Sequence, residues 1–210
     1  MRTNTLFFAL LLSATTALCG APVESGPWVE DTPNFALHQC AGGKVNGDTF
    51  ELPKSPNGST SGPGCGNGHL RAERRYNDNY SSGVHQFSGE FKINSMSGSR
   101  ICLKQTFNGS GGGNGGPYFL LAVEKGGDLY KVGGTPIAKG VATIGATVRV
   151  NTVHDVAKRR LSLYINGKEM YRDDNAPKGS FYDKIGTYAT DSGTGAISVT
   201  WSDVQFWHKG

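Results

Sequence analysis

Short runs in which apolar and polar residues alternate dominate this chain from His69 onward. Phe87, Phe91 and Ile93 fall on one parity of an extended segment, and polar residues stand between them. No window sustains a helical period, because glycine or proline interrupts nearly every candidate. Glycine supplies 31 of the 210 residues, against a usual share of about 7%. Many short antiparallel strands with tight turns predict an all-β fold, a two-sheet antiparallel β-sandwich of the jelly-roll type.

Turn signals divide the later part of the chain into hairpins. Asn166-Gly167 is the strongest two-residue hairpin signal, and Gly126-Gly127 is the next. Residues 22–68 instead read as loop-rich, with one short strand at 50–52. Neither a repeat nor a linker divides the rest, so we expect residues 22–210 to form a single domain.

The N-terminus has the features of a secretory signal peptide. Arg2 precedes the apolar run 6–12, and the small residues Gly20 and Ala21 follow it. The run is too short to span a membrane. We therefore expect residues 1–21 to be removed and the mature protein to be secreted, with no membrane partner.

Cysteine usage agrees with export. Cys19 falls in the expected signal peptide, and Cys40 and Cys65 lie in loop-like sequence, so we expect those two to pair. Cys102 lies in an apolar strand, either as another partner or as a buried free thiol. Asn-x-Ser sequons fit a glycoprotein where the host glycosylates, and they begin at Asn57, Asn79 and Asn108.

The densest polar cluster runs from residue 69 to residue 75. Alternate residues of an extended chain share a face, so His69, Arg71, Glu73 and Arg75 line one surface of one strand. A carboxylate between two guanidiniums can hold both arginines in place. Such a row of cations suits a carboxylate-bearing ligand. The alternative is a solvated ladder of salt bridges on an outer sheet face.

Two further segments add polar side chains to strands. Tyr182, Lys184, Gly186 and Tyr188 share one face of a late strand, where the lysine favours ionisation of a nearby phenol. Gln105 places a neutral amide in a hydrophobic strand. Taken singly, these patterns also fit an ordinary tyrosine-rich strand and a satisfied buried glutamine.

The three segments together, in their order and spacing, resemble the secreted alginate lyases of polysaccharide lyase family 7. That family has an Arg-x-Glu-x-Arg strand, then Gln-x-His, then Tyr-x-Lys-x-Gly-x-Tyr-x-Gln, and the resemblance covers residues 69–208. The chain departs from the pattern at Phe107, where the family has histidine, and at Thr190, where it has glutamine. His69 extends the arginine face by one step. A histidine so placed is similar to that of the glucuronan lyases of family 20, which share the jelly-roll fold.

This resemblance implies a concanavalin A-like jelly roll that cleaves an acidic polyuronate by β-elimination and needs no cofactor for the chemistry. It assigns Arg71 and Gln105 to the sugar carboxylate, Tyr188 to protonation of O4, and His69 to the role of base or of holding the proton of Tyr188. The substrate-binding residues that we expect are Glu73, Arg75, Arg149, Tyr182 and Lys184.

Other interpretations remain open. A non-catalytic glycan-binding module is the main alternative, with Trp28, Tyr118 or Tyr164 as stacking platforms. A glycosidase needs two carboxylates across the scissile bond, whereas Glu73 is flanked by arginines.

Weaker signals concern ions and partners. Asp173 and Asp174 are candidate ligands of a structural calcium, or a solvated turn. Arg149 extends the binding face or joins a ladder pair. The basic run 158–160 fits a solvated hairpin tip, and secretion argues against a nucleic-acid partner. We expect a monomer that acts on an acidic polysaccharide.

Overall fold

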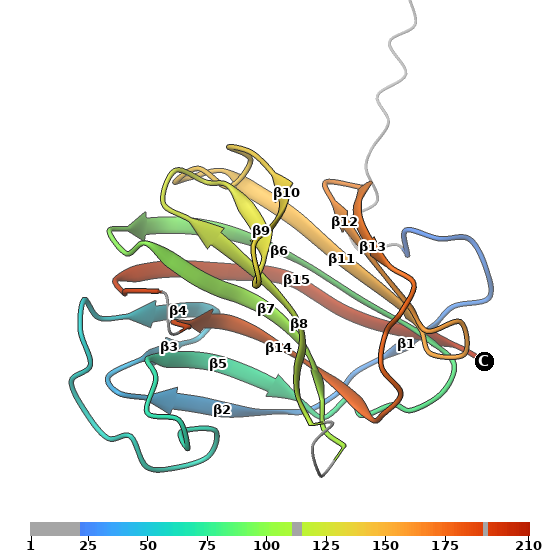
Figure 1. Cartoon of the computed structure of the whole chain (residues 1–210), viewed down its shortest axis with the longest axis horizontal. Coiled ribbons are helices and arrows are strands. Elements are labelled where there is room, and N and C mark those ends of the chain that lie inside the picture. Colours follow the sequence, from blue (N-terminus) through green and yellow to red (C-terminus); the bar gives the residue numbers. More distant parts are fainter. Residues whose placement is uncertain (1–21, 111–114, 191–192) are drawn as a thin grey trace, which may run out of the picture.

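The computed structural model describes residues 22–110, 115–190 and 193–210, in which fifteen strands form two antiparallel sheets (Figure 1). The expected signal peptide with Cys19, and residues 111–114 of a glycine-rich stretch, lie outside the described residues. Within the described ranges, no helix has the length and apolar character needed to cross a membrane.

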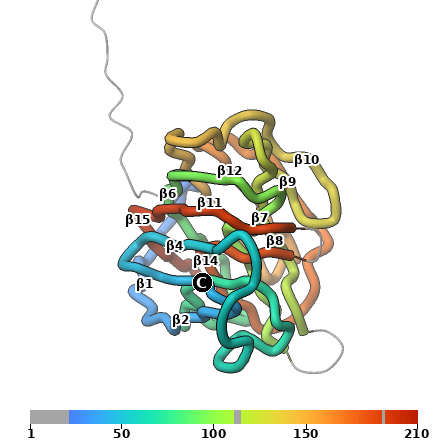
Figure 2. The backbone as a smooth tube through the Cα atoms, turned by 90° about the vertical axis from the view of Figure 1, so that its left-hand side faces the viewer, coloured from blue at the N-terminus to red at the C-terminus, as the bar shows by residue number. Residues whose placement is uncertain are grey.

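The two sheets stack as a jelly-roll sandwich, as predicted. The larger sheet has the order β13 (Lys168–Asp173), β12 (Arg160–Ile165), β11 (Thr147–Asp155), β6 (Val84–Met96), β15 (Ile197–Lys209), β4 (Thr49–Leu52) and β3 (Lys44–Asn46), and β1 (Val29–Asp31) also pairs with β15. The smaller sheet has the order β10 (Thr135–Ala138), β9 (Leu129–Lys131), β8 (Gly116–Glu124), β7 (Arg100–Asn108), β14 (Phe181–Tyr188), β5 (Arg71–Tyr76) and β2 (Phe35–Cys40). Figure 2 shows the same chain turned by 90°.

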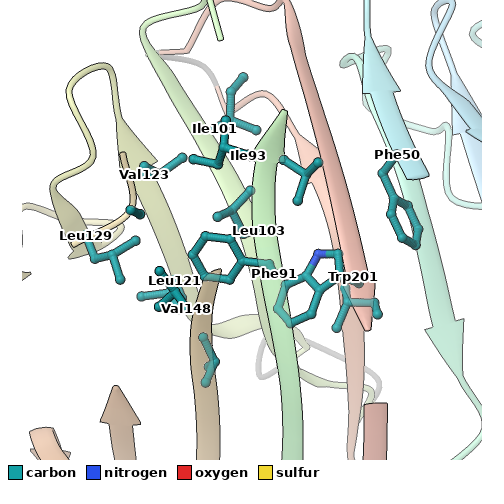
Figure 3. Close-up of a cluster of buried hydrophobic side chains, with 14 of the residues drawn as sticks. Phe50, Phe91, Ile93, Ile101, Leu103, Leu121, Val123, Leu129, Val148 and Trp201 are labelled. Atoms are coloured by element: carbon teal, nitrogen blue, oxygen red, sulfur yellow. The ribbon is translucent and has the colours of Figure 1, made fainter. Parts of the chain in front are cut away.

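The core lies between the sheets and is built from alternate residues of each strand. Phe91 and Ile93 of β6 and Trp201 of β15 meet Leu103 and Leu121 of the smaller sheet (Figure 3). Each of these side chains is at most 1% exposed. Burial of one such side chain contributes about 1.5–3 kcal/mol, so the alternation seen in the sequence is the main source of cohesion between the layers.

The N-terminal part is more ordered than the sequence indicates. Residues 22–68 contain β1 to β4 rather than one short strand, so that expectation is wrong. The side chains of β2 are mostly exposed, which removes the apolar alternation that marks a strand. Backbone pairing with β5 makes it a strand instead.

The strongest turn signal is confirmed. Asn166 and Gly167 join β12 to β13 with φ of 51° and 79°, the left-handed conformations that a tight hairpin turn requires. The expected disulfide is also present, between Cys40 of β2 and Cys65, whereas Cys102 is a buried free thiol.

The three sequons differ in accessibility. Asn57 and Asn79 are exposed, whereas Asn108 is 1% exposed and its side chain bonds to the backbone of Ser110 and Lys178. Glycosylation stays a prediction, and the exposed pair Asn57 and Asn79 are its candidate positions.

A charged network crosses the core near the middle of β7. The fully buried Lys104 ammonium donates to Asp183 at 2.7 Å and to Thr152 of the larger sheet at 2.8 Å. Burial, and then the Asp183 charge, raise the pKa of Asp78 to about 8. A register shift between Cys102 and Lys104 interrupts the alternation of β7, so the lysine faces the core.

Candidate active site

The three polar motifs come together because their strands are neighbours. Tyr188 of β14 pairs with Arg71 of β5, and Lys184 pairs with Arg75 on one side and Gln105 of β7 on the other. These side chains lie on the face of the smaller sheet opposite the core. We call this set the polar face, and its members are Arg71, Glu73, Arg75, Gln105, Tyr182, Lys184 and Tyr188.

The Tyr188 phenol has three polar neighbours. Its oxygen lies 2.8 Å from Nδ1 of His69 and 2.9 Å from Nδ2 of Asn67, and the Arg71 guanidinium carbon lies 4.2 Å from the ring centroid. Burial raises the pKa of Tyr188, while the Arg71 charge and the Asn67 hydrogen bond oppose that rise. This grouping places an amide hydrogen-bond donor, an imidazole nitrogen and a fixed cation around one phenol.

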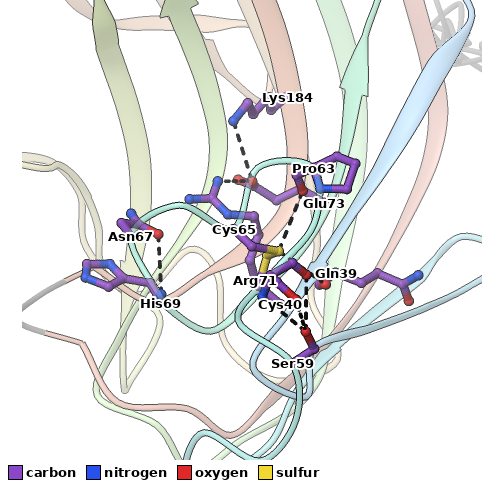
Figure 4. The surroundings of a disulfide bond; sticks show 11 residues. Gln39, Cys40, Ser59, Pro63, Cys65, Asn67, His69, Arg71, Glu73 and Lys184 are labelled. Atoms are coloured by element: carbon purple, nitrogen blue, oxygen red, sulfur yellow. Dashed lines mark hydrogen bonds and ion pairs between the residues drawn. A yellow bond between two sulfur atoms is a disulfide. The ribbon is translucent and has the colours of Figure 1, made fainter.

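Glu73 organises one part of the polar face, which we call the floor and which consists of Glu73, Arg71, Arg75, Gln105 and Lys184. Its Oε2 accepts from Arg71 at 2.5 Å and lies 3.8 Å from the Lys184 ammonium (Figure 4). Its Oε1 accepts from Gln105. Arg71 is 6%, Gln105 2% and Lys184 4% exposed. The carboxylate therefore holds donors from three strands, but of the two arginines expected from the sequence it binds Arg71, whereas Arg75 donates to Asn77 and Asn79.

The floor has an excess of positive charge. Three cations, Arg71, Arg75 and Lys184, surround the one carboxylate of Glu73, and the buried Nε of Arg71 has no hydrogen-bond partner among the described residues. Burial first, and then those three cations, lower the pKa of His38 on β2 to about 4. The same potential that disfavours an imidazolium favours a bound anion.

Aromatic rings extend the polar face away from Tyr188. The Arg75 guanidinium carbon lies 4.0 Å from the ring centroid of Tyr182, and Arg75 also donates to Asn77 and Asn79. Tyr182 stacks on Phe107 with centroids 5.1 Å apart. Phe107, at the position of the family histidine, thus packs against Tyr182.

Arg149 is the one expected binding residue that the structure places elsewhere, which corrects that prediction. It lies on β11 of the larger sheet, and its guanidinium pairs with Glu90 at 2.6 Å. The alternation of residues in the sequence shows which side chains of a strand share a face with Arg149, but it does not show which of the two sheets that strand joins. Arg149 instead forms a cross-strand ion pair, which is the alternative given in the sequence analysis.

The three suggested stacking platforms also lie outside the polar face. Trp28 carries Lys209 over its ring, and Tyr164 bonds to acidic side chains at the larger sheet. Tyr118 donates to Asp173, which occupies one oxygen of a suggested calcium ligand. Among the described residues no cluster of three or more His, Cys, Asp or Glu side chains is placed to hold a metal ion, and the calcium site stays a prediction.

Two residues of the site were missed in the sequence. Asn67 lies in the loop before His69, and a side-chain amide two residues from a candidate base was the available signal. His38 lies in a segment that we expected to be a loop, so the sequence did not indicate which way its side chain points.

Comparison with known proteins identifies related structures. No protein-family model matches the sequence, and no curated protein matches it. An alginate lyase from Pseudomonas aeruginosa matches with a TM-score of 0.62 at 18% identity over 80% of this chain and 86% of that one. The alginate lyase from Corynebacterium sp. gives 0.59 at 16% over 80% and 81%. The family 7 alginate lyase A1-II' in complex with substrate gives 0.57 at 16% over 80% and 81%. The fold is therefore the alginate-lyase type of jelly roll.

Proposed function

We propose that this protein is a secreted polysaccharide lyase that cleaves an acidic polyuronate, of glucuronan or alginate type, by β-elimination. The observation that carries the proposal is the Tyr188 phenol, with His69 Nδ1 at 2.8 Å and the Arg71 guanidinium against its ring. The shared fold of the alginate lyases supports the same reaction class.

The reaction needs three acts at one sugar ring. A base removes the proton from C5, the electron pair of that C–H bond becomes the C4=C5 double bond, and the C4–O4 pair leaves with O4, which takes a proton. The C5 proton is weakly acidic because the neighbouring carboxylate resists further negative charge. A site that neutralises this carboxylate therefore lowers the barrier.

Tyr188 and His69 supply the proton transfers in this proposal. His69 Nδ1 takes the phenolic proton, the resulting tyrosinate removes the C5 proton, and the phenol then protonates O4 on the same side of the ring. The proton on His69 returns to Tyr188. Each turnover thus moves one proton from C5 to O4 and leaves both side chains as they began.

The floor supplies the electrostatic part. The buried Nε–H of Arg71 has no hydrogen-bond partner within the described part of the chain, and Arg75 and Lys184 add charge that attracts a polyanion. The Gln105 amide donates to Glu73, so Gln105 can bind the sugar carboxylate only after that hydrogen bond is broken. A glycosidase mechanism is disfavoured, because both oxygens of Glu73 are held by cations or an amide.

Two observations favour the second candidate, a non-catalytic glycan-binding module. Arg71 and Gln105 are already engaged with Glu73, and Phe107 replaces the family histidine. Such a protein keeps the positive face and binds the polymer without turning it over.

Ultraviolet absorbance separates the two candidates, because unsaturated uronate products absorb and intact polymers do not. The mature protein is incubated with glucuronan and with alginate, beside Tyr188→Phe and the matched control Tyr164→Phe on the larger sheet. We expect absorbance with at least one polymer, its loss in Tyr188→Phe with binding retained, and no change in Tyr164→Phe. Binding without absorbance for both polymers would replace the lyase by the binding module.

Secretion is tested by N-terminal sequencing of protein from the culture medium, where a start near residue 22 is expected.

A further inference from the structure

The loop residue Asn67 makes two hydrogen bonds that fix the orientation of its amide. Its Oδ1 accepts from the backbone N–H of His69 at 3.3 Å, and its Nδ2 donates to the Tyr188 oxygen at 2.9 Å. Because a backbone N–H can only donate, the atom facing it must be the amide oxygen. The other end, which faces the phenol, is therefore a donor.

This contact favours one direction for the phenolic proton. The Tyr188 oxygen accepts from Asn67, so its own hydrogen is left to donate to the second neighbour, Nδ1 of His69 at 2.8 Å. A neutral His69 that accepts with Nδ1 carries its hydrogen on Nε2. The same amide thus holds the backbone of one member of the pair and the oxygen of the other.

We propose that Asn67 is a positioning residue that directs the phenolic proton of Tyr188 to His69 and stabilises the tyrosinate that forms. The catalytic meaning of this inference rests on the proposed function, whereas the hydrogen-bond geometry does not. The amide touches the phenol and the loop backbone, and it acts on the sugar only through Tyr188.

The charged and titratable groups around Tyr188 come from three segments. Arg71 and Glu73 face it from β5, Cys102 faces it from β7, and His69 lies in the loop before β5. Arg71 favours the tyrosinate, and Glu73 disfavours it. Asn67 adds a neutral donor that favours the tyrosinate without changing the charge of the site.

The loop that carries Asn67 is fixed to the sheet nearby. Cys65 is joined to Cys40 of β2, and the Gly68 amide donates to the Cys65 carbonyl at 3.0 Å (Figure 4). Asn67 lies inside that turn. The exposed side chain therefore has a fixed backbone under it, which a positioning residue requires.

The test uses Asn67→Asp and Asn67→Ala, with Asn46→Ala, an exposed residue of β3, as the matched control. Asn67→Asp keeps an acceptor for the His69 amide but puts a negative charge beside the phenol, which by itself disfavours the tyrosinate. Asn67→Ala removes the donor without changing the charge of the site, so it is the variant that isolates the proposed interaction. The pKa of Tyr188 is measured by NMR of ring-carbon-labelled tyrosine in the full mature protein. Its signal is assigned by its absence in Tyr188→Phe.

We expect the pKa of Tyr188 to rise in both Asn67 variants and to stay unchanged in Asn46→Ala. On a cleaved polyuronate, kcat should fall about tenfold or more, with little change in KM and an upward shift of the pH profile. An unchanged or lower pKa of Tyr188 in folded Asn67→Ala would overturn the inference. The pKa measurement needs no turnover. A raised pKa in a protein that cleaves no polymer would keep the positioning role and remove the lyase.

Discussion

Removal of the Cys40–Cys65 disulfide should lower both the global stability and the order of the loop that carries Asn67 and His69. The bond closes a segment with a sequence separation of 25, for which loop-closure entropy gives about 3.5 kcal/mol. The Ala41 amide also donates to the Ser59 carbonyl at 2.7 Å, a contact that does not depend on the disulfide bond itself. Because such contacts retain part of the closure, we expect a loss of about 3 kcal/mol.

The assay is urea unfolding followed by tryptophan fluorescence, since Trp201 and Trp207 are buried. Wild type is compared with and without reductant, beside Cys40→Ala/Cys65→Ala. The reductant should destabilise wild type and leave the double variant unchanged, which excludes an effect through the free thiol of Cys102. A loss below about 1 kcal/mol would refute the closure argument. It would mean that the backbone contacts alone hold the loop.

The remaining predictions concern the core and the polar face. Because the pKa of Asp78 is raised to about 8 in the fold, against about 3.9 unfolded, its contribution to stability is fully present below the unfolded value and is lost as pH rises through the folded value. Urea unfolding from pH 6 to 9 should therefore show a steeper loss for wild type than for Asp78→Asn. Lys104→Met leaves the buried Asp183 carboxylate without its cation and should cost about 3–5 kcal/mol, and an equal stability in the same assay would contradict this. Gly186 has a φ of 132°, and a Cβ there would lie 2.2 Å from a backbone oxygen of β5, so Gly186→Ala should cost about 2 kcal/mol or more in thermal unfolding. Gly66→Ala, with no atom within 4 Å of the added carbon, should be close to neutral.

The fold was predictable where side-chain alternation and turn chemistry agree. Phe91 and Ile93 of β6 point into the core as their spacing requires, and Asn166-Gly167 forms the turn that its dihedral preferences favour. β2 was not predictable in this way, because its side chains are mostly exposed and its pairing partner β5 is distant in the sequence.

The candidate site was predictable as far as strand parity and motif order reach. Arg71, Glu73, Gln105 and Tyr188 share one face because three strands are adjacent. Arg149 had a suitable parity but belongs to the other sheet. Asn67 was missed because a loop residue has no periodicity, and its position depends on a disulfide and a turn that only the folded chain brings together.

The register shift in β7 determines which side chains of this strand face the core and which lie on the polar face. Cys102 packs beside Tyr188, Gln105 bonds to Glu73 on that same side, and Lys104 reaches the opposite layer. Strict alternation would group Lys104 with Cys102 and send Gln105 inward. Removing Leu103 or Lys104 would therefore delete the extra residue and leave Cys102 and Gln105 on the polar face, and only the loss of Lys104 would take the ammonium out of the sandwich interior.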